Sequence, residues 1–167
     1  MVKVNCGIAL AVLILFVMVY SLLSSKCDEW DRGNFPPFVQ RLSKNGTEDY
    51  CSLYERKMNL SKYDFYYSLL EWAEKYQVLG EMERFINQEM KYERKLNKLL
   101  VKKLRNINGT SEAKNVLFKI LKLQRNVFRP LIEIDQTINR LMGALPERIR
   151  HEATVLWNML SPHDICA

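Results

Sequence analysis

The sequence predicts an all-α protein: a compact bundle of about five to six helices that follows a cleaved signal peptide and an extended leader. Two observations support this prediction. Apolar residues recur at steps of three and four through most of the chain, which is the spacing of one face of an α-helix. No segment of useful length alternates apolar and polar residues, which a half-buried β-strand would require.

The chain begins with an apolar segment from Ile8 to Leu23, which Lys3 precedes and Ser24 and Ser25 follow. A helix of this length would measure roughly 24 Å, less than the roughly 30 Å hydrocarbon core of a bilayer. A basic start, an apolar centre and small exit residues are typical of a secretory signal peptide. We therefore predict a signal peptide over 1–25 and a secreted protein, with an uncleaved signal anchor as the alternative. No second apolar run follows, so a multi-pass membrane protein is not expected.

Residues 26–46 lack helical periodicity and contain Gly and Pro at several positions, which predicts an extended leader. A helical domain is expected over 47–161, followed by a tail over 162–167. Thr47 is suited to cap a short first helix that runs from Glu48 to Lys57.

A second helix is expected to begin at Ser61, where Asp64 completes an approximate capping box. Its apolar face is formed by residues at helical spacing, namely Phe65, Leu69, Trp72 and Tyr76. Trp72 could line a ligand pocket, but a Trp on such a face is more often a core anchor, and we favour the core. Gly80 is expected to break this helix.

Three further helical segments are expected after Gly80. A long helix runs from about Glu81 to Ile107, where Asn108-Gly109 stops it. Another begins at Ser111 and carries Val127 and Phe128 among its apolar residues. Pro130 ends or kinks it because proline lacks an amide hydrogen, and the apolar pattern then continues to Gly143. A last helix is expected to open at Pro146 and to run through Leu160.

Three N-x-Ser/Thr sequons support export, with candidate glycans at Asn45, Asn59 and Asn108. All three fall in segments that we predict to be loops between helices, where a bulky glycan projects into solvent. The sequence therefore predicts a glycoprotein.

The cysteine content predicts few disulfide bonds. Cys6 would leave with the signal peptide, so Cys27, Cys51 and Cys166 are the disulfide candidates. In an oxidising compartment one disulfide and one remaining thiol are expected. Three pairings satisfy this arrangement, and the sequence does not choose among them.

A stripe of basic residues follows one face of the long helix, at steps of four, three, four and three: Lys91, Lys95, Lys98, Lys102 and Arg105. Residues 91–105 contain seven basic side chains and one acidic side chain, a net charge equal to the +6 of the whole chain. Such a concentration can bind an anionic glycan or lipid surface, although a run of charges more often forms only a solvated helix face. No nucleic-acid recognition motif accompanies the stripe.

Motifs that carry catalysis are absent from the sequence, which contains neither G-x-S-x-G nor H-E-x-x-H nor a phosphate-binding glycine loop. We therefore expect a protein that is not an enzyme. The calcium loop of an EF-hand is also absent. Pairs such as Glu133 with Asp135, or Asp64 with Glu71, would need ligands from elsewhere in the fold, although magnesium is held by as few as one or two carboxylates plus water.

One block of the sequence resembles a known family. A Pro36-Pro37-Phe38 entry, a helix, the Asn59-Leu60-Ser61 helix start and the Trp72-Ala73 pair follow one another as they do in the SXP/RAL group of secreted nematode antigens. The domain of that family is described as Anisakis-allergen-like and cation-binding. The resemblance extends over residues 36–160 and implies an all-α domain that binds a cation, without indicating which residues are its ligands.

We therefore predict a secreted, non-enzymatic helical binding protein that takes a divalent cation (Mg or Ca) or a small apolar ligand. No cofactor is certain, and the cation is expected only from the family resemblance. The alternative is an extracellular interaction protein whose basic helix docks on anionic glycans or membranes.

Overall fold

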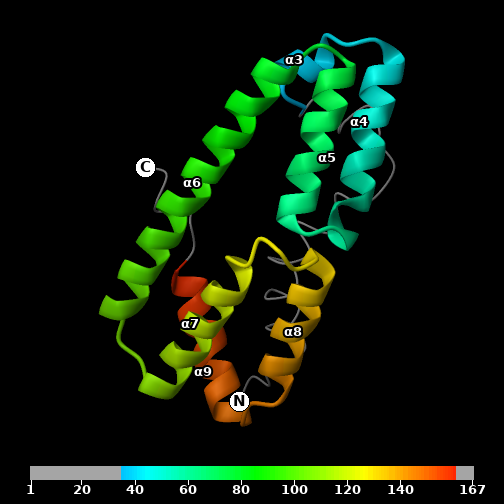
Figure 1. Cartoon of the computed structure of the whole chain (residues 1–167). Helices are drawn as coiled ribbons and strands as arrows, with labels where there is room; N and C mark the ends of the chain where they lie inside the picture. Colours follow the sequence, from blue (N-terminus) through cyan, green and yellow to red (C-terminus); the bar gives the residue numbers. More distant parts are fainter. Residues whose placement is uncertain (1–34, 161–167) are drawn as a thin grey trace, which may run out of the picture. The chain divides into compact units, whose positions relative to one another are not determined.

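The computed structural model describes residues 35–160 (Figure 1). These residues contain seven α-helices, a short 3-10 helix and no β-strand, so the predicted all-α class is confirmed with slightly more helices than expected. The predicted signal peptide, residues 26–34 of the predicted leader and the predicted tail lie outside the described residues. Within the described range, no helix is both long and apolar enough to cross a bilayer.

The described residues divide into two compact units. Residues 35–90 and 127–133 form the first, which we call the aromatic unit. Residues 91–126 and 134–160 form the second, which we call the aliphatic unit. Each is described by itself.

The aromatic unit begins with helix α3 (Pro37–Gln40) and helix α4 (Lys44–Arg56). The prediction that the leader remains extended to residue 46 is therefore wrong. Ser43, not Thr47, caps α4, because its Oγ accepts a hydrogen bond from the Gly46 amide at 3.4 Å. The Thr47 hydroxyl instead donates back to the Ser43 carbonyl at 3.2 Å, as a residue inside the first turn does.

After the short η2 helix (Lys57–Asn59), helix α5 (Lys62–Lys75) begins at the predicted place. Ser61 is its N-cap and accepts from the Asp64 amide at 3.0 Å. The Asp64 carboxylate accepts from the Ser61 hydroxyl at 2.6 Å, which shows how the shorter Asp completes the cap. Helices α4 and α5 run side by side (Figure 1).

The expectation that Gly80 breaks this helix is wrong, since Gly80 lies within α6 (Leu79–Asn106). The chain turns at Gln77, whose φ of 58° is left-handed. The Val78 amide donates to the Ala73 carbonyl at 2.9 Å and the Gln77 amide donates to the Glu74 carbonyl at 3.1 Å. These two bonds are the pair expected of a Schellman motif, so the break is a hydrogen-bonded cap with Gln where glycine is usual.

Aromatic rings fill the core of the first unit. Tyr50 is fully buried and contacts Phe35, Tyr54 and Trp72, with ring centroids 5.0, 4.8 and 5.0 Å away. Trp72 is 5% exposed, which confirms it as a core anchor. Helix α6 adds Met82 and Ile86 to this cluster.

The aliphatic unit contains the end of α6, helix α7 (Ser111–Gln124), most of α8 (Leu131–Gly143) and α9 (Glu147–Met159). Helices α7 and α9 pack side by side (Figure 1). Apart from Met142 and Thr154, the buried side chains of this unit are aliphatic, and they include Leu104, Val116, Leu117, Ile120, Leu121, Ile134, Ile138, Leu156 and Leu160.

Helix α7 ends at Gln124, four residues earlier than expected. The prediction that Val127 and Phe128 lie on this helix is therefore wrong, and their side chains are 37% and 75% exposed. They follow the helix rather than belong to it, and the next helix begins only after Pro130.

Candidate functional site

The five residues of the basic stripe all lie on α6 within the aliphatic unit, and each is exposed: Lys91, Lys95, Lys98, Lys102 and Arg105. None of them makes a salt bridge with another residue of the range 35–160. On another face of the same helix, Leu104 is fully buried and Leu96 and Leu100 are half-buried. The helix therefore presents a continuous cationic surface, whose partner stays a prediction.

A shallow groove of about 470 Å³ lies beside the end of this stripe. Its lining combines apolar and basic side chains: Leu99, Lys102, Lys103, Asn106, Ile107 and Met159. The volume lies within the roughly 300–1,000 Å³ of small-molecule pockets. The small apolar ligand that the sequence suggested stays a prediction.

The three predicted glycosylation residues, Asn45, Asn59 and Asn108, are all exposed. Only Asn108 lies in a loop between helices, whereas Asn45 lies in the first turn of α4 and Asn59 ends η2. The expectation of three loop sites is wrong for two of them. Their modification stays a prediction.

Of the disulfide candidates, Cys51 lies on α4 and is 4% exposed. Cys27 and Cys166 lie outside the described residues. The pairing therefore stays a prediction with its three alternatives.

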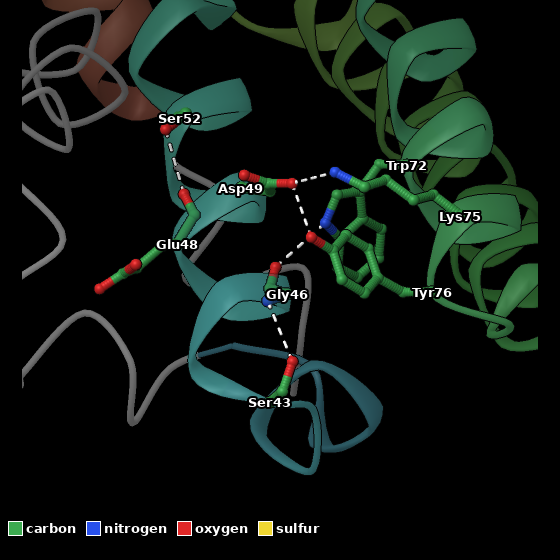
Figure 2. A network of polar contacts seen from close by, with 8 residues as sticks. All are labelled: Ser43, Gly46, Glu48, Asp49, Ser52, Trp72, Lys75 and Tyr76. Atoms are coloured by element: carbon green, nitrogen blue, oxygen red, sulfur yellow. Dashed lines mark hydrogen bonds and ion pairs between the residues drawn. The ribbon is translucent and has the colours of Figure 1, made fainter.

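A polar network that the sequence did not reveal joins α4 to α5 (Figure 2). Lys75 Nζ and the Tyr76 hydroxyl donate to Asp49 Oδ2 at 2.7 and 2.6 Å. Beside them Trp72 Nε1 donates to the Gly46 carbonyl at 3.1 Å. The hydrogen bonds from Lys75 and Tyr76 lower the pKa of Asp49, and the same bonds to Asp49 raise the pKa of both donors. The partners are 26 and 27 residues apart, so no local spacing could have predicted this network.

A second unpredicted network ties α9 to the start of α7. The Glu152 carboxylate accepts from the Thr110 amide and from the Thr110 hydroxyl, each at 2.7 Å. These two bonds lower the pKa of Glu152. The Thr110 hydroxyl in turn accepts from the Ala113 amide at 3.3 Å, so one residue caps α7 and holds it to α9.

Asp135, on α8, has an oxygen in an unusual environment. Its Oδ1 atom is buried and has no hydrogen-bond partner among residues 35–160, while Oδ2 accepts from Asn139 Nδ2 at 3.4 Å. Burial raises the pKa of Asp135, and the Asn139 hydrogen bond opposes this shift only partly. A buried carboxylate oxygen without a donor is costly, and a proton, a water or a cation would relieve that cost.

Of the carboxylate pairs considered from sequence, neither forms a cation site by itself. Glu133 is exposed and lies two positions before Asp135, and residues at this spacing on a helix do not face each other. Asp64 is engaged by the Ser61 hydroxyl. Residues 35–160 contain no group of three Asp, Glu, His or Cys side chains that could hold a metal ion.

Comparison with known proteins gives one finding. The family described as SXP/RAL-2 family protein Ani s 5-like, metal-binding domain, matches residues 8–151. Neither a curated protein nor a solved structure gives a match. The family match covers most of the chain, and the resemblance that the Pro-Pro-Phe, Asn-Leu-Ser and Trp-Ala elements indicated is therefore confirmed. The chain belongs to the SXP/RAL-2 family, as a protein with the Ani s 5-like metal-binding domain.

Proposed function

We propose that the protein is a secreted, non-enzymatic binding protein that takes up a divalent cation, magnesium or calcium. Two observations support this. The family is described by metal binding, and Asp135 Oδ1 is a buried oxygen that lacks a hydrogen-bond donor within the described range. The second observation carries the proposal, because a cation beside that oxygen would offset the cost of burying it unpaired.

The ligand chemistry favours a hard cation. Asp135 would supply a carboxylate oxygen. Asn139, one turn later, now donates from Nδ2 to Asp135, and its amide would have to turn over to supply an oxygen ligand. Oxygen ligands of this kind suit magnesium and calcium better than zinc. Magnesium retains several waters and needs only one or two protein carboxylates, so two side chains and water are a sufficient set.

Titration calorimetry with magnesium chloride and calcium chloride tests this proposal. Asp135→Asn should weaken binding by about tenfold or more, since it removes the charged ligand at nearly constant volume. Glu133→Gln is the matched control, because it neutralises an exposed carboxylate two residues earlier and should leave the affinity unchanged. Binding that survives Asp135→Asn, or a wild-type protein that binds neither cation, would refute the assignment.

Secretion is supported by the predicted signal peptide, by three exposed sequons and by kinship with a secreted antigen family. Expression in eukaryotic cells, followed by intact mass measurement of the exported protein, tests it. The expected product starts after the predicted signal peptide and carries glycans that a glycosidase removes. Peptide mapping of a proteolytic digest under non-reducing conditions shows which cysteine pairs with which. Retention of the full chain in the membrane fraction would instead favour the signal anchor.

A second candidate function is docking on an anionic glycan or lipid surface, which the five exposed cations along one face of α6 favour. Closely spaced charges of one sign bind polyanions in a salt-dependent way, because released counterions favour the complex at low salt. Retention on a heparin column should therefore fall steeply as the salt concentration rises.

Charge reversal tests whether this surface is responsible. The triple variant Lys95→Glu, Lys98→Glu, Lys102→Glu should elute at clearly lower salt than the wild-type protein. An equal charge change on α7 and its C-cap is the matched control: Lys119→Glu, Lys122→Glu, Arg125→Glu, all exposed. Equal losses in both variants would show that net charge alone, and not the stripe, accounts for retention.

A further inference from the structure

We propose that the groove lined by α6 and α9 binds one long-chain fatty acid, with the acyl chain along its apolar wall and the carboxylate beside Lys102. All the residues that line this groove belong to the aliphatic unit. The proposal rests neither on a cation at Asp135 nor on docking to a polyanion, although Lys102 also belongs to the basic stripe.

An inner row of side chains forms the apolar floor of the groove. Leu99, Lys103 and Ile107 follow one another at steps of four, and all three are half-buried. Side chains at this spacing lie one above the other on a helix, so the row is continuous over two turns. Lys103 contributes the methylene stem that a half-buried lysine lays along apolar surface. The inner row therefore offers a strip along which an acyl chain can lie.

Helix α9 supplies the facing wall. Met159, in its last turn, lines the groove and is 54% exposed. Methionine is unbranched and flexible, so it adapts to an irregular apolar ligand. An acyl chain in the groove would cover this side chain as well as the inner row.

An outer row provides partners for a carboxylate. Lys102 and Asn106 line the same groove, are one helical turn apart and are both exposed. The Lys102 ammonium and the Asn106 amide are hydrogen-bond donors, and a bond from an ammonium to a carboxylate is charge-assisted. Among residues 35–160, no acidic side chain lines the groove.

The charge of the surrounding unit also favours an anion. The described residues of the aliphatic unit contain fourteen basic and five acidic side chains, a formal net charge of +9. The carbonyl end of α6 opposes an anion with roughly half a charge, and the full charges of Lys102 and Lys103 outweigh it.

The two rows together indicate the class of ligand. A polyanion would use the outer row and leave the inner row exposed, whereas a neutral apolar ligand would leave the outer row unused. The volume of about 470 Å³ suits one small molecule. Six lining residues are far fewer than the roughly 20–30 per side of a stable protein interface. A single amphiphile with an anionic head group matches both rows and the size.

Fluorescence displacement tests the proposal on the full-length protein. Dansyl-labelled undecanoic acid is the probe, and oleate should displace it more effectively than the uncharged methyl oleate does. Met159→Glu should weaken oleate binding by about tenfold or more, because it replaces an apolar wall with a charge of the ligand's own sign. Val155→Glu is the matched control. It makes the same change one turn earlier on α9, at a side chain that is 44% exposed and outside the groove lining, and should bind as the wild-type protein does.

A second pair of variants separates this site from the basic stripe. Lys102→Gln and Lys95→Gln each remove one exposed cation of the stripe, so both should lower heparin retention equally. Only Lys102→Gln should weaken oleate binding, by about threefold, since Lys95 does not line the groove.

Three results would overturn the proposal. The first is unchanged oleate binding by Met159→Glu, and the second is methyl oleate that binds as tightly as oleate. The third is a wild-type protein that binds vesicles of phosphatidylserine but no monomeric oleate, which would assign the basic residues to a membrane surface instead.

Discussion

The two units of this protein use different chemistry to hold their helices together. In the aromatic unit, Tyr50, Trp72 and their neighbours form a stack of rings, and the indole nitrogen is bonded to a backbone carbonyl of α4. In the aliphatic unit, branched and unbranched aliphatic side chains fill the core. Aromatic rings pack in preferred geometries, and the polar groups of Trp and Tyr also form hydrogen bonds. Aliphatic side chains contribute mainly through the volume that they fill. The aromatic unit should therefore depend on particular side chains, and the aliphatic unit on close packing.

Both units share one device, a carboxylate that clamps two helices at the surface. Asp49 joins α4 to α5, and Glu152 joins α9 to the N-terminus of α7. The candidate sites divide between the units. The basic stripe, the groove and Asp135 belong to the aliphatic unit, while Cys51 and the exposed Phe128 belong to the aromatic unit.

The largest effect is expected for Trp72→Ala, which should lower the free energy of unfolding by about 3–5 kcal/mol. It removes the central ring and leaves the Gly46 carbonyl without its indole donor. Hydrogen exchange monitored by mass spectrometry should show a greater loss of protection in α5 than in α7, since units with separate cores open separately. Equal loss of protection in both helices would contradict the division into two units.

A smaller loss, about 1–3 kcal/mol, is expected for Gly109→Ala in the aliphatic unit. A Cβ atom at this position would lie 2.7 Å from Leu156 Cδ1, so the buried leucine must shift. Thermal unfolding measures the change. Gly143→Ala is the control, because no atom lies within 4 Å of the Cβ it adds, and it should not destabilise the protein. A neutral result for Gly109→Ala would show that this core tolerates added volume.

Gln77→Gly should stabilise the protein by about 0.5–1 kcal/mol. Glycine adopts the left-handed conformation of the α5 C-cap without the steric cost that a side chain has there, although it loses more entropy on folding. Gln88→Gly, the same change at an exposed position inside α6, should instead destabilise by about 1 kcal/mol. Denaturant unfolding measures the change in the free energy of unfolding for each variant. If both variants stabilise the protein, or both destabilise it, the capping assignment of Gln77 is wrong.

The smallest effect concerns pH. Because the folded pKa of Asp49 is lowered, its stabilising contribution is present above the ordinary aspartate value of about 3.9 and is lost as the pH falls through the folded value. Asp49→Asn should thus melt below the wild-type protein at neutral pH, and this difference should shrink in acid. Glu152→Gln should behave in the same way in the other unit, because the pKa of Glu152 is also lowered. If the difference in melting temperature grew in acid, the pKa of these carboxylates could not be lowered in the folded protein.

Local sequence patterns determined most of the helices. The cap at Ser61 and the starts at Ser111 and after Pro146 lie where the sequence predicted them, because caps and apolar spacing act over one or two turns. The prediction failed where two local signals competed. Ser43 and Thr47 are both good caps, and the packing of Gly46 against Tyr76 accompanies a helix that starts at the earlier one.

The sequence by itself thus determined the all-α class, the family and the basic stripe, since each depends on residue types at fixed spacing along the chain. The folded chain was needed to reveal the Asp49 and Glu152 clamps, the unpaired oxygen of Asp135 and the exposed ring of Phe128. These features depend on contacts between residues far apart in sequence, or on a helix ending four residues early. Their energies arise from burial and from hydrogen-bond geometry, and neither quantity is encoded in the spacing of residues along one helix.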